Sequence, residues 1–500
     1  MTDQTTPILV GVAAITQRSE EAGSGDDAIE LMIRATRDAA ADCGNVAVLK
    51  QIDDIAVPKG VWAYSDPARL VADAIAAGDC AGEKAPNTLL ANLGVTQQLL
   101  ISRACLAIAE GNASVMLVTG GESKYRDLRA TIAGIEPRRV EQVNVEPDET
   151  LVPHAELWSP VESAAGLGMP VGYYAIIDSA LRYEQGHSID QQRDDMAELY
   201  AGFSRIAADN PDAWVREPVA AEFIREPSAK NKMLAFPYTK LHNSQWNVDQ
   251  ASAMIFCSVA KARELGIPQH KWVYPLCATE SNFMTVVAQR RKLHRCEGFE
   301  IAGQRAFELA AKTPQDIEHM EIYSCFPAAV RVQVAELGVD PNRPLSVTGA
   351  MTFGGGPLNN FVFQATVKMA QVLRDNPGDT GMVTCVSSFL TKQGVALWST
   401  TPAPNGYGFE DVSSAVAAAT SLCEVVPGFD GPATVAGYTV LYRGDAPWRG
   451  VVICNLPDGK RTVAYSESAQ VMAQMEAAEY CGREVTLAGN VFEPAAPPPG

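Results

Sequence analysis

Paired cysteine motifs and long apolar runs are both missing from this sequence of 500 residues. Its 11 cysteines are scattered without any Cys-x-x-Cys pair, which favours reduced thiols in the cytoplasm over a disulfide framework. The sequence shows no metal-ligand cluster either. The N-terminus, MTDQTTPILVGVAAI, is polar and acidic before one short apolar run, so neither a signal peptide nor a membrane span is expected.

Positive charge is also in short supply, because 59 Asp and Glu outnumber 40 Lys and Arg and give a net charge of -19 at pH 7. An acidic chain is not drawn nonspecifically to nucleic acid or anionic lipid, although it can hold a local basic pocket. What is present is ordinary globular composition, with 47% hydrophobic and 20% charged residues. The chain is long enough for about three domains.

Residues 87–123 combine a turn, a helix and a strand, and we expect them at the centre of the protein. Apolar residues on most faces of Gln97–Ala109 predict a buried helix, which Gly111 ends before a short strand at 115–118. A side chain at position 94 would face the N-terminus of that helix, where unpaired amides lower the pKa of a thiol. A nucleophilic cysteine would be well placed there, but the residue is glycine.

The second half of the chain repeats the first with a constant offset of 267 residues. The offset pairs Gly111 with Gly378 and Val115 with Met382, each within a helix, glycine, strand pattern. Two copies of an α/β unit are therefore predicted to pack as a pseudo-dimer.

Composition and element order divide the chain into five parts. Charged loops and amphipathic helices at 124–240 interrupt the first unit, short strands with tight turns follow residue 405, and the end is rich in proline. The expected parts are residues 1–123 with 241–268 for the N-terminal half, 124–240 for an inserted loop domain, 269–404 for the C-terminal half, 405–493 for a small β domain and 494–500 for a disordered tail.

Four short motifs resemble those of the thiolase superfamily, over about residues 8–399. Residues 243–251, NSQWNVDQA, are similar to that family's coenzyme A (CoA) loop, and residues 323–326, YSCF, stand where thiolases carry Asn-Glu-Ala-Phe or His-Asp-Cys-Phe. Residues 355–357, GGP, stand where they carry Gly-His-Pro, and residues 385–387, CVS, where they carry Cys-x-Gly. The resemblance implies an α/β, duplicated thiolase fold of two layered halves with an inserted loop domain, followed by a β-barrel similar to the oligonucleotide/oligosaccharide-binding (OB) type.

The resemblance also implies a ligand, which is CoA or an acyl-CoA bound without a covalent link. The glycine turn either approaches that ligand with bare backbone amides or makes only a tight turn. Neither a metal nor a nucleic acid partner is expected, and the oligomeric state is left open. The residues expected to hold the ligand are His242, Asn243, Ser244, Gln245, Gly354, Gly355 and Gly356.

A thiolase needs a cysteine nucleophile, a histidine base and a second cysteine that moves a proton. The resemblance puts Gly94 at the nucleophile, Gly356 at the histidine and Tyr323 at the asparagine that holds a water in the oxyanion site. Cys385 is the one catalytic residue kept. Cys385 and Tyr323 are therefore the candidate catalytic residues, each with a plain alternative as a buried core residue, and His242 has one as a hydrogen-bonding residue.

Three functions remain open on these residues. The favoured one is a thiolase-like protein that binds CoA or acyl-CoA without the usual thiolase chemistry. The second is an active acyltransferase of the acetyl-CoA C-acyltransferase type in lipid metabolism. The third is a retro-aldol lyase acting on CoA thioesters. Its Tyr323 phenol would have a pKa lowered from about 10 and exchange a proton with a β-hydroxyl, while the glycine turn holds the thioester oxygen.

Overall fold

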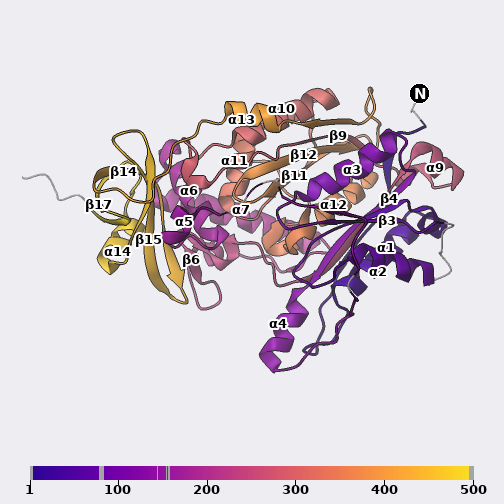
Figure 1. The fold of residues 1–500 in the computed structure, drawn as a ribbon, viewed down its shortest axis with the longest axis horizontal. Coiled ribbons are helices and arrows are strands. Elements are labelled where there is room, and N and C mark those ends of the chain that lie inside the picture. Colours follow the sequence, from indigo (N-terminus) through magenta and orange to yellow (C-terminus); the bar gives the residue numbers. More distant parts are fainter. Residues whose placement is uncertain (1–3, 78–83, 144, 154, 156–157, 495–500) are drawn as a thin grey trace, which may run out of the picture.

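The computed structural model describes residues 4–77, 84–143, 145–153, 155 and 158–494. Two central sheets lie side by side, and a third sheet stands at one end of an elongated molecule (Figure 1). All but the first residue of the tail expected at 494–500 lies outside the described residues.

The first sheet has six strands. They are β1 (Pro7–Thr16), β2 (Asp54–Pro58), β3 (Asn87–Ala91), β4 (Val115–Ser123), β5 (Glu149–Leu151) and β8 (Asp249–Ser258). Their order is β1-β8-β4-β2-β3-β5. β8 runs antiparallel to β1 and β4, whereas β4, β2, β3 and β5 run parallel to one another. Every residue of β4 and β8 is buried, so both faces of the sheet are covered at its centre.

The second sheet has five strands. They are β9 (Tyr274–Glu280), β10 (His319–Glu321), β11 (Thr380–Ser387), β12 (Thr391–Ser399) and β13 (Gly408–Asp411). Their order is β10-β11-β12-β9-β13. β12 runs antiparallel to β11 and β9, while β10 runs parallel to β11 and β13 runs parallel to β9.

The two sheets follow one plan. β1, β8, β4 and β2 correspond in order and in direction to β9, β12, β11 and β10. The offset of 267 takes Pro7, which begins β1, to Tyr274, which begins β9, and it takes Val115 of β4 to Met382 of β11. The predicted α/β fold with two similar halves is confirmed.

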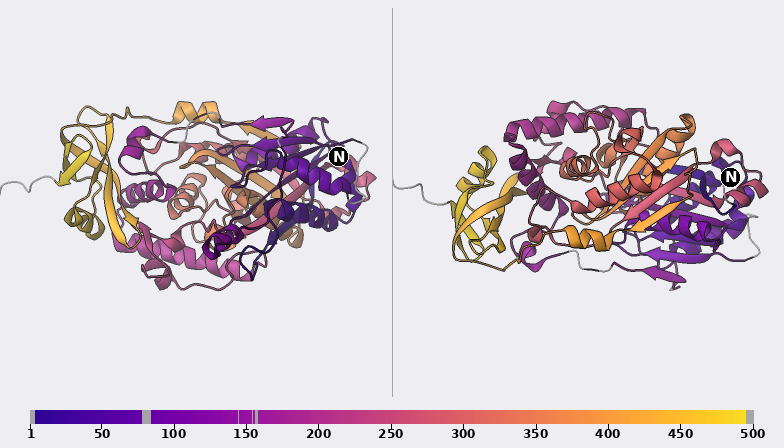
Figure 2. Two further views of the ribbon diagram at one scale, coloured as in Figure 1. Left: turned by 60° about the horizontal axis from the view of Figure 1, so that its bottom comes forward. Right: turned by 90° about the horizontal axis from the view of Figure 1, so that it is seen from above.

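Helices cover the outer faces of the two sheets and fill the space between them (Figure 2). They are α1 (Ala28–Asp42), α2 (Pro67–Ile75), α3 (Gln97–Ala109), α9 (Val259–Glu264), α10 (Glu297–Ala310), α11 (Pro327–Leu337) and α12 (Phe361–Asp375). α3 and α12 contact strands of both sheets and form the central layer, whereas α1 packs on the first sheet and α10 on the second. Eight of the thirteen residues of α3 are buried, so its predicted burial is confirmed.

Local sequence explains where these helices begin and end. Asp27 and Glu30 form a reciprocal capping box at the start of α1, which satisfies two backbone donors that lack a helical partner. Prolines stand in the first turn of α2 and α11, where their missing N–H costs nothing. Gly338 ends α11 with a left-handed residue.

The residues between β4 and β8 form the inserted region. Their elements are α4 (Lys124–Ala133), α5 (Pro160–Ala164), α6 (Pro170–Gln185), α7 (Ile189–Asp209), α8 (Ala221–Arg225), β6 (Met233–Ala235) and β7 (Tyr238–Thr239). α4 projects away from the two sheets (Figure 1). β5 extends the first sheet, and β6 joins the C-terminal sheet. The insertion therefore adds strands to both the first sheet and the C-terminal sheet. The expected domain boundaries stay predictions.

The C-terminal region contains α13 (Ser413–Ala419), β14 (Gly431–Arg443), β15 (Ala446–Asn455), β16 (Arg461–Ser466), α14 (Ala469–Ala477), β17 (Glu484–Ala488) and β18 (Val491–Pro494). Pairing runs from β14 through β15, β16, β18 and β17 and returns to β14. These strands therefore form a closed ring, with β6 and β7 attached beside β14. The OB-type assignment of this ring stays a prediction.

A buried arginine fastens the ring to the insertion. Arg182 of α6 donates from Nε to Glu479 at 2.9 Å, from one terminal nitrogen to Gln192 at 2.7 Å and from the other to the Tyr438 hydroxyl at 2.8 Å. Its side chain is almost fully buried, so these partners replace the water that the guanidinium loses.

Short helical turns complete the chain between these elements. They are η1 (Val46–Gln51), η3 (Lys240–His242), η4 (Gln269–Lys271), η5 (Val287–Gln289), η6 (Pro314–Asp316), η7 (Ala350–Gly354) and η8 (Leu358–Asn360). In the described part of the chain, no helix combines the length and the apolar character that a bilayer crossing requires.

Candidate functional site

Gly94 lies in the loop between β3 and α3, where the backbone turns with φ of 94°. Its carbonyl oxygen accepts a hydrogen bond from Lys392 Nζ at 2.7 Å and one from Ser387 Oγ at 3.3 Å. A Cβ at this position would lie 3.2 Å from Pro153 Cβ and 3.9 Å from Lys392 Nζ. Position 94 therefore faces β12 on one side and the inserted region on the other.

Cys385 of β11 lies beside the first turn of α3. The Gly394 backbone passes between them, since a Cβ at 394 would be 3.2 Å from the Cβ atoms of both Cys385 and Gln98. The thiol is completely buried. Burial raises the pKa of Cys385 to about 12, although the N–H groups of Gln98 and Gln97 face the sulfur and oppose that rise. The thiol is therefore protonated at neutral pH.

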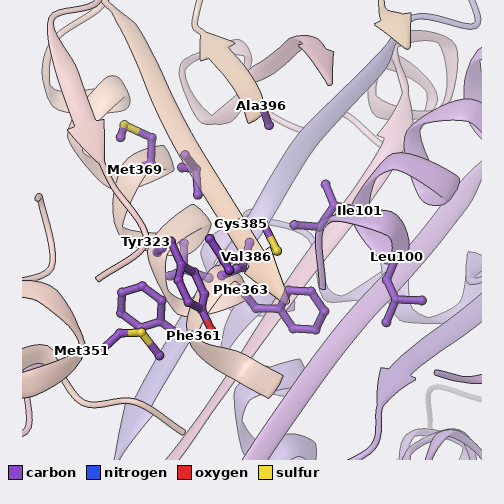
Figure 3. Close-up of a cluster of buried hydrophobic side chains, with 14 of the residues drawn as sticks. Leu100, Ile101, Tyr323, Met351, Phe361, Phe363, Met369, Cys385, Val386 and Ala396 are labelled. Atoms are coloured by element: carbon purple, nitrogen blue, oxygen red, sulfur yellow. The ribbon is translucent and has the colours of Figure 1, made fainter. Parts of the chain in front are cut away.

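Tyr323 follows β10 and lies in the same buried cluster as Cys385 (Figure 3). Its ring packs edge-on against Phe361 with 5.8 Å between centroids, and its N–H donates to Thr384 Oγ1 at 2.8 Å. The residue is 9% exposed, and its phenol oxygen has no hydrogen-bond partner within the described ranges. Burial raises the pKa of Tyr323 well above its usual value, and negative charge on Cys325 or Cys385 would raise it further.

The expectation of a lowered Tyr323 pKa is therefore wrong. That expectation relied on unspecified neighbours to lower the pKa, whereas the ring lies among apolar side chains and thiols. Desolvation penalises the phenolate in such surroundings. The phenol therefore stays protonated near neutral pH, where it can donate a hydrogen bond but cannot act as a base.

The predicted CoA loop contacts the predicted glycine turn directly. The N–H of Gly356 donates to the carbonyl of Gln245 at 2.9 Å, and the N–H of Gln245 donates to Met351 at 3.0 Å. The N–H of Ser244 donates to Cys325 at 3.2 Å. Asn243 closes the loop by donating from its amide to the Thr239 carbonyl at 2.6 Å. Segments more than 100 residues apart in sequence thus meet at one place, two residues from Tyr323.

Two of the three glycine N–H groups of the turn are already hydrogen-bonded within the protein. The N–H groups of Gly354 and Gly356 already donate to Gly349 and Gln245. Gly355 is a glycine for a steric reason, because its φ is 102° and a Cβ would lie 2.0 Å from Gln250 Oε1. These contacts favour the alternative of a tight turn for Gly354 and Gly356, and ligand binding by the glycine turn stays a prediction.

His242 lies next to the loop in sequence, but its side chain points into the core. It is 1% exposed and packs edge-on against Tyr200, with 5.3 Å between ring centroids. Its Nδ1 accepts from the Thr239 N–H at 3.2 Å, and burial lowers the pKa of His242 to about 3. This neutral, enclosed ring favours the structural alternative, and ligand binding by His242 stays a prediction.

The sequence analysis missed Lys392, which is 2% exposed and donates to the Gly94 carbonyl. The sequence does contain one indication of it. Residues 389–398, FLTKQGVALW, have the composition of a buried strand, and a lysine is unusual in such a strand. Gly94, Cys385, Ser387 and Lys392 therefore converge at the N-terminus of α3.

A cavity of about 510 Å³ opens elsewhere, between β3, α3 and β5. Arg103 and Glu149 line its edge and bind each other through two hydrogen bonds of 2.8 and 2.7 Å. It lies away from the CoA loop, so it does not match the ligand site that the sequence predicts.

Comparison with known proteins identifies the fold family. Residues 411–489 match the family described as "Thiolase-like protein type 1 additional C-terminal domain". The crystal structure of a monomeric SCP2-thiolase like protein type 1 from Mycobacterium smegmatis is 26% identical, has a TM-score of 0.81 and covers 99% of this chain and 100% of its own. The chain belongs to the thiolase superfamily.

More distant members agree with this assignment. An acetyl-CoA acetyltransferase of Methanothermobacter thermautotrophicus is 24% identical over 234 residues, which are 43% of this chain and 58% of that relative. The chain thus spans under three fifths of the length of this relative. The structure of an acetyl-CoA acetyltransferase from Syntrophomonas wolfei is 18% identical, with a TM-score of 0.56 over 80% of this chain and 100% of its own, and it supports the fold alone.

Glu280 is a buried carboxylate at the end of β9. We expect its protonation to change the stability of the protein with pH. It is 2% exposed, it accepts from the Asn282 amide at 3.3 Å, and its Oε2 has no partner among the described residues. Burial raises the pKa of Glu280 to about 7. The folded state therefore holds the proton more tightly than the unfolded chain, and the stability that this contributes is lost as pH rises from about 4.5 to about 7.

Glu280→Gln should consequently raise stability more at pH 8 than at pH 5, with a difference of about 2 kcal/mol in the free energy of unfolding. Urea melts at the two pH values measure it. Glu217→Gln, at an exposed position, is the matched control and should show no such difference. Equal effects of Glu280→Gln at both pH values would show that the carboxyl is ionised in the folded protein.

Proposed function

We propose that this thiolase-like protein binds CoA or an acyl-CoA beside the junction of the 243–245 loop and the Gly356 turn, without the usual thiolase chemistry. The observation that carries the proposal is the hydrogen-bonded contact of Gln245 with Gly356, because it assembles two motifs that resemble the family's ligand site. The names of the acetyl-CoA acetyltransferase relatives support a CoA thioester as the ligand class.

We expect no acyl transfer because the site lacks the cysteine and histidine side chains that a thiolase uses for it. Gly94 stands at the position of the nucleophile and Gly356 at that of the histidine, so neither a cysteine thiolate nor a histidine base is available there. Cys385 cannot replace the nucleophile at neutral pH, since its thiol is buried and its pKa is raised to about 12. A ligand thioester would therefore be held without forming an acyl-enzyme on cysteine.

Two other functions keep weaker support. An active acyltransferase of lipid metabolism agrees with the relatives' names, but it lacks a nucleophile at Gly94. A retro-aldol lyase needs a base for the β-hydroxyl, and the raised pKa of Tyr323 keeps its phenol protonated. The cytoplasmic location remains part of the proposal.

Isothermal titration of CoA into the protein tests the binding site. We expect saturable heat at micromolar to millimolar ligand, and at least about tenfold weaker binding in Ser244→Trp, because the indole would fill the space over Gly356. A Cβ at 356 would already lie 3.1 Å from Ser244 Cβ, so little room remains for a ligand beside a larger side chain.

Ser414→Trp is the control, since Ser414 is exposed on α13. It should bind as the wild type does. Absence of heat from the folded wild-type protein at millimolar CoA, or equal binding by Ser244→Trp, would remove the proposed site.

A further inference from the structure

A β-bulge directs Lys392 toward the loop before α3. In the β11–β12 hairpin, Ser387 pairs with Thr391 and Val386 pairs with Gln393, so Lys392 is the extra residue between the two pairs. Its φ is 50°, a left-handed value that is uncommon for a residue with a long side chain.

Backbone strain is concentrated at this turn. Ser388 and Leu390 also have positive φ values, of 66° and 55°, so three residues other than glycine within five positions leave the favoured regions. Such conformations cost free energy and persist where the surroundings enforce them, most often at functional sites. The Tyr174 hydroxyl helps to hold the turn, because it donates to the Ser388 carbonyl and accepts from the Leu390 N–H.

The ammonium of Lys392 has no counter-ion among the described residues. Its one hydrogen bond there goes to the Gly94 carbonyl, and burial lowers the pKa of Lys392. Lys59 and Lys124 also have lowered pKa values, but the carboxylate of Glu122 opposes the shift at each. A buried amine without a carboxylate loses its proton more easily than an exposed amine does, which makes it a better nucleophile.

The space beside Nζ is the space that a side chain at position 94 would occupy. The three atoms nearest to a Cβ at 94 are two of Pro153 and Nζ of Lys392. Because residue 94 is glycine, a ligand atom can take that place and reach the amine if Pro153 shifts by a few tenths of an ångström, since a Cβ there would lie 3.2 Å from Pro153 Cβ. Lys392 thus adds a reactive group at the point where Gly94 removes one.

We propose that Lys392 is a nucleophilic amine that forms a Schiff base with an oxo group on the acyl chain of a bound thioester. The inference rests on the proposed function, because the thioester site supplies the ligand. It differs from acyl transfer, since the thioester bond stays intact and no cysteine takes part.

The step balances with water as its only by-product. The neutral amine attacks the oxo carbon, a C–N bond forms as the carbonyl π bond opens, and the product is a carbinolamine. The oxygen then leaves as water with the two protons of the nitrogen, and a C=N bond remains. Neither an oxidant nor a further reactant is required.

Borohydride trapping tests the proposal in the full chain. The protein is incubated with acetoacetyl-CoA, reduced with sodium borohydride and analysed by intact mass and peptide mapping. We expect one reduced adduct on Lys392 that retains the thioester chain. Labelling should fall at least about tenfold in Lys392→Met and in Lys392→Arg, since neither side chain supplies a neutral amine.

Two further samples separate the possible explanations. Lys124→Met is the matched control and should label as the wild type does, because its ammonium faces Glu122. The alternative is that Lys392 only holds the Gly94 carbonyl in place. In that case Lys392→Arg would still fold, and the wild-type protein would carry no label at position 392. Thermal melts verify the fold of each variant, and Lys392→Met removes a buried unpaired charge, so it should fold.

Each outcome decides between the two claims. Titratable CoA binding without an adduct at 392 overturns the Schiff base and leaves the binding site standing. An adduct at 392 from the acetoacetyl thioester of N-acetylcysteamine, in a protein that gives no heat with CoA, supports the nucleophile and removes the CoA site. An adduct formed without borohydride that has lost CoA would be an amide, which contradicts the proposed step.

Discussion

Incubation with acetyl-CoA should leave every cysteine of the wild-type protein without an acetyl group, and thiolysis of acetoacetyl-CoA should be at least about 10⁴-fold slower than in a thiolase that carries the cysteine and histidine. The reason is chemical, because Gly94 supplies no thiol and Cys385 is buried and protonated. Intact mass spectrometry and a coupled thiolysis assay measure both quantities.

Gly94→Cys should change this result. Its sulfur would stand at the N-terminus of α3, whose unpaired amides should lower the pKa of the new thiol, and its Cβ would lie 3.9 Å from Lys392 Nζ. The φ of 94° adds strain of about 1–2 kcal/mol, which a stable domain tolerates. We expect acetylation by acetyl-CoA at position 94 of the folded variant.

Gly168→Cys provides the matched control, since a Cβ there meets no atom within 4 Å and the position is exposed. Its thiol should remain ordinary and acetylate far more slowly. Equal rates at 94 and 168, or an acyl adduct on the wild type, would show that the loop before α3 is not the reacting position.

Asp178→Ala should destabilise the protein by about 3–5 kcal/mol, because it removes the centre of a buried polar network. Asp178 of α6 is completely buried, accepts from the Tyr238 hydroxyl at 2.6 Å and pairs with Arg331 of α11. Tyr238 in turn accepts from the Ala328 N–H at 3.0 Å. Truncation would leave a largely buried guanidinium and a phenol without their acceptor.

Chemical unfolding measures this loss. Asp195→Ala is the control, since Asp195 is half-exposed beside His187, and it should change stability by less than about 1 kcal/mol. A small effect of Asp178→Ala would mean that the insertion and the second half are not held together through this carboxylate.

Local and repeating patterns predicted the fold well. The apolar faces of α3 and the 267-residue offset identified a buried helix and two matching sheets, because period and spacing are visible in one dimension. The pairing of β6 with the C-terminal ring was not predicted, since the sequence of a three-residue strand is too short to indicate which strand it pairs with.

The sequence predicted which segments of the candidate site lie together better than it predicted the surroundings of their side chains. Motif resemblance brought Gln245 and Gly356 together correctly in space. It could not show that Tyr323 lies among apolar groups, which reverses the direction of its pKa shift. It also missed Lys392, because a bulge reorients that side chain and a bulge depends on the register of two paired strands.

A crystal structure of the protein with acetyl-CoA tests the account most directly. We predict an intact thioester with its pantetheine arm along residues 243–245 and its sulfur between Gly94 and Gly356, with no density joining it to a cysteine. An acetyl group on Cys385, or a ligand bound only in the cavity between β3, α3 and β5, would contradict the proposed site.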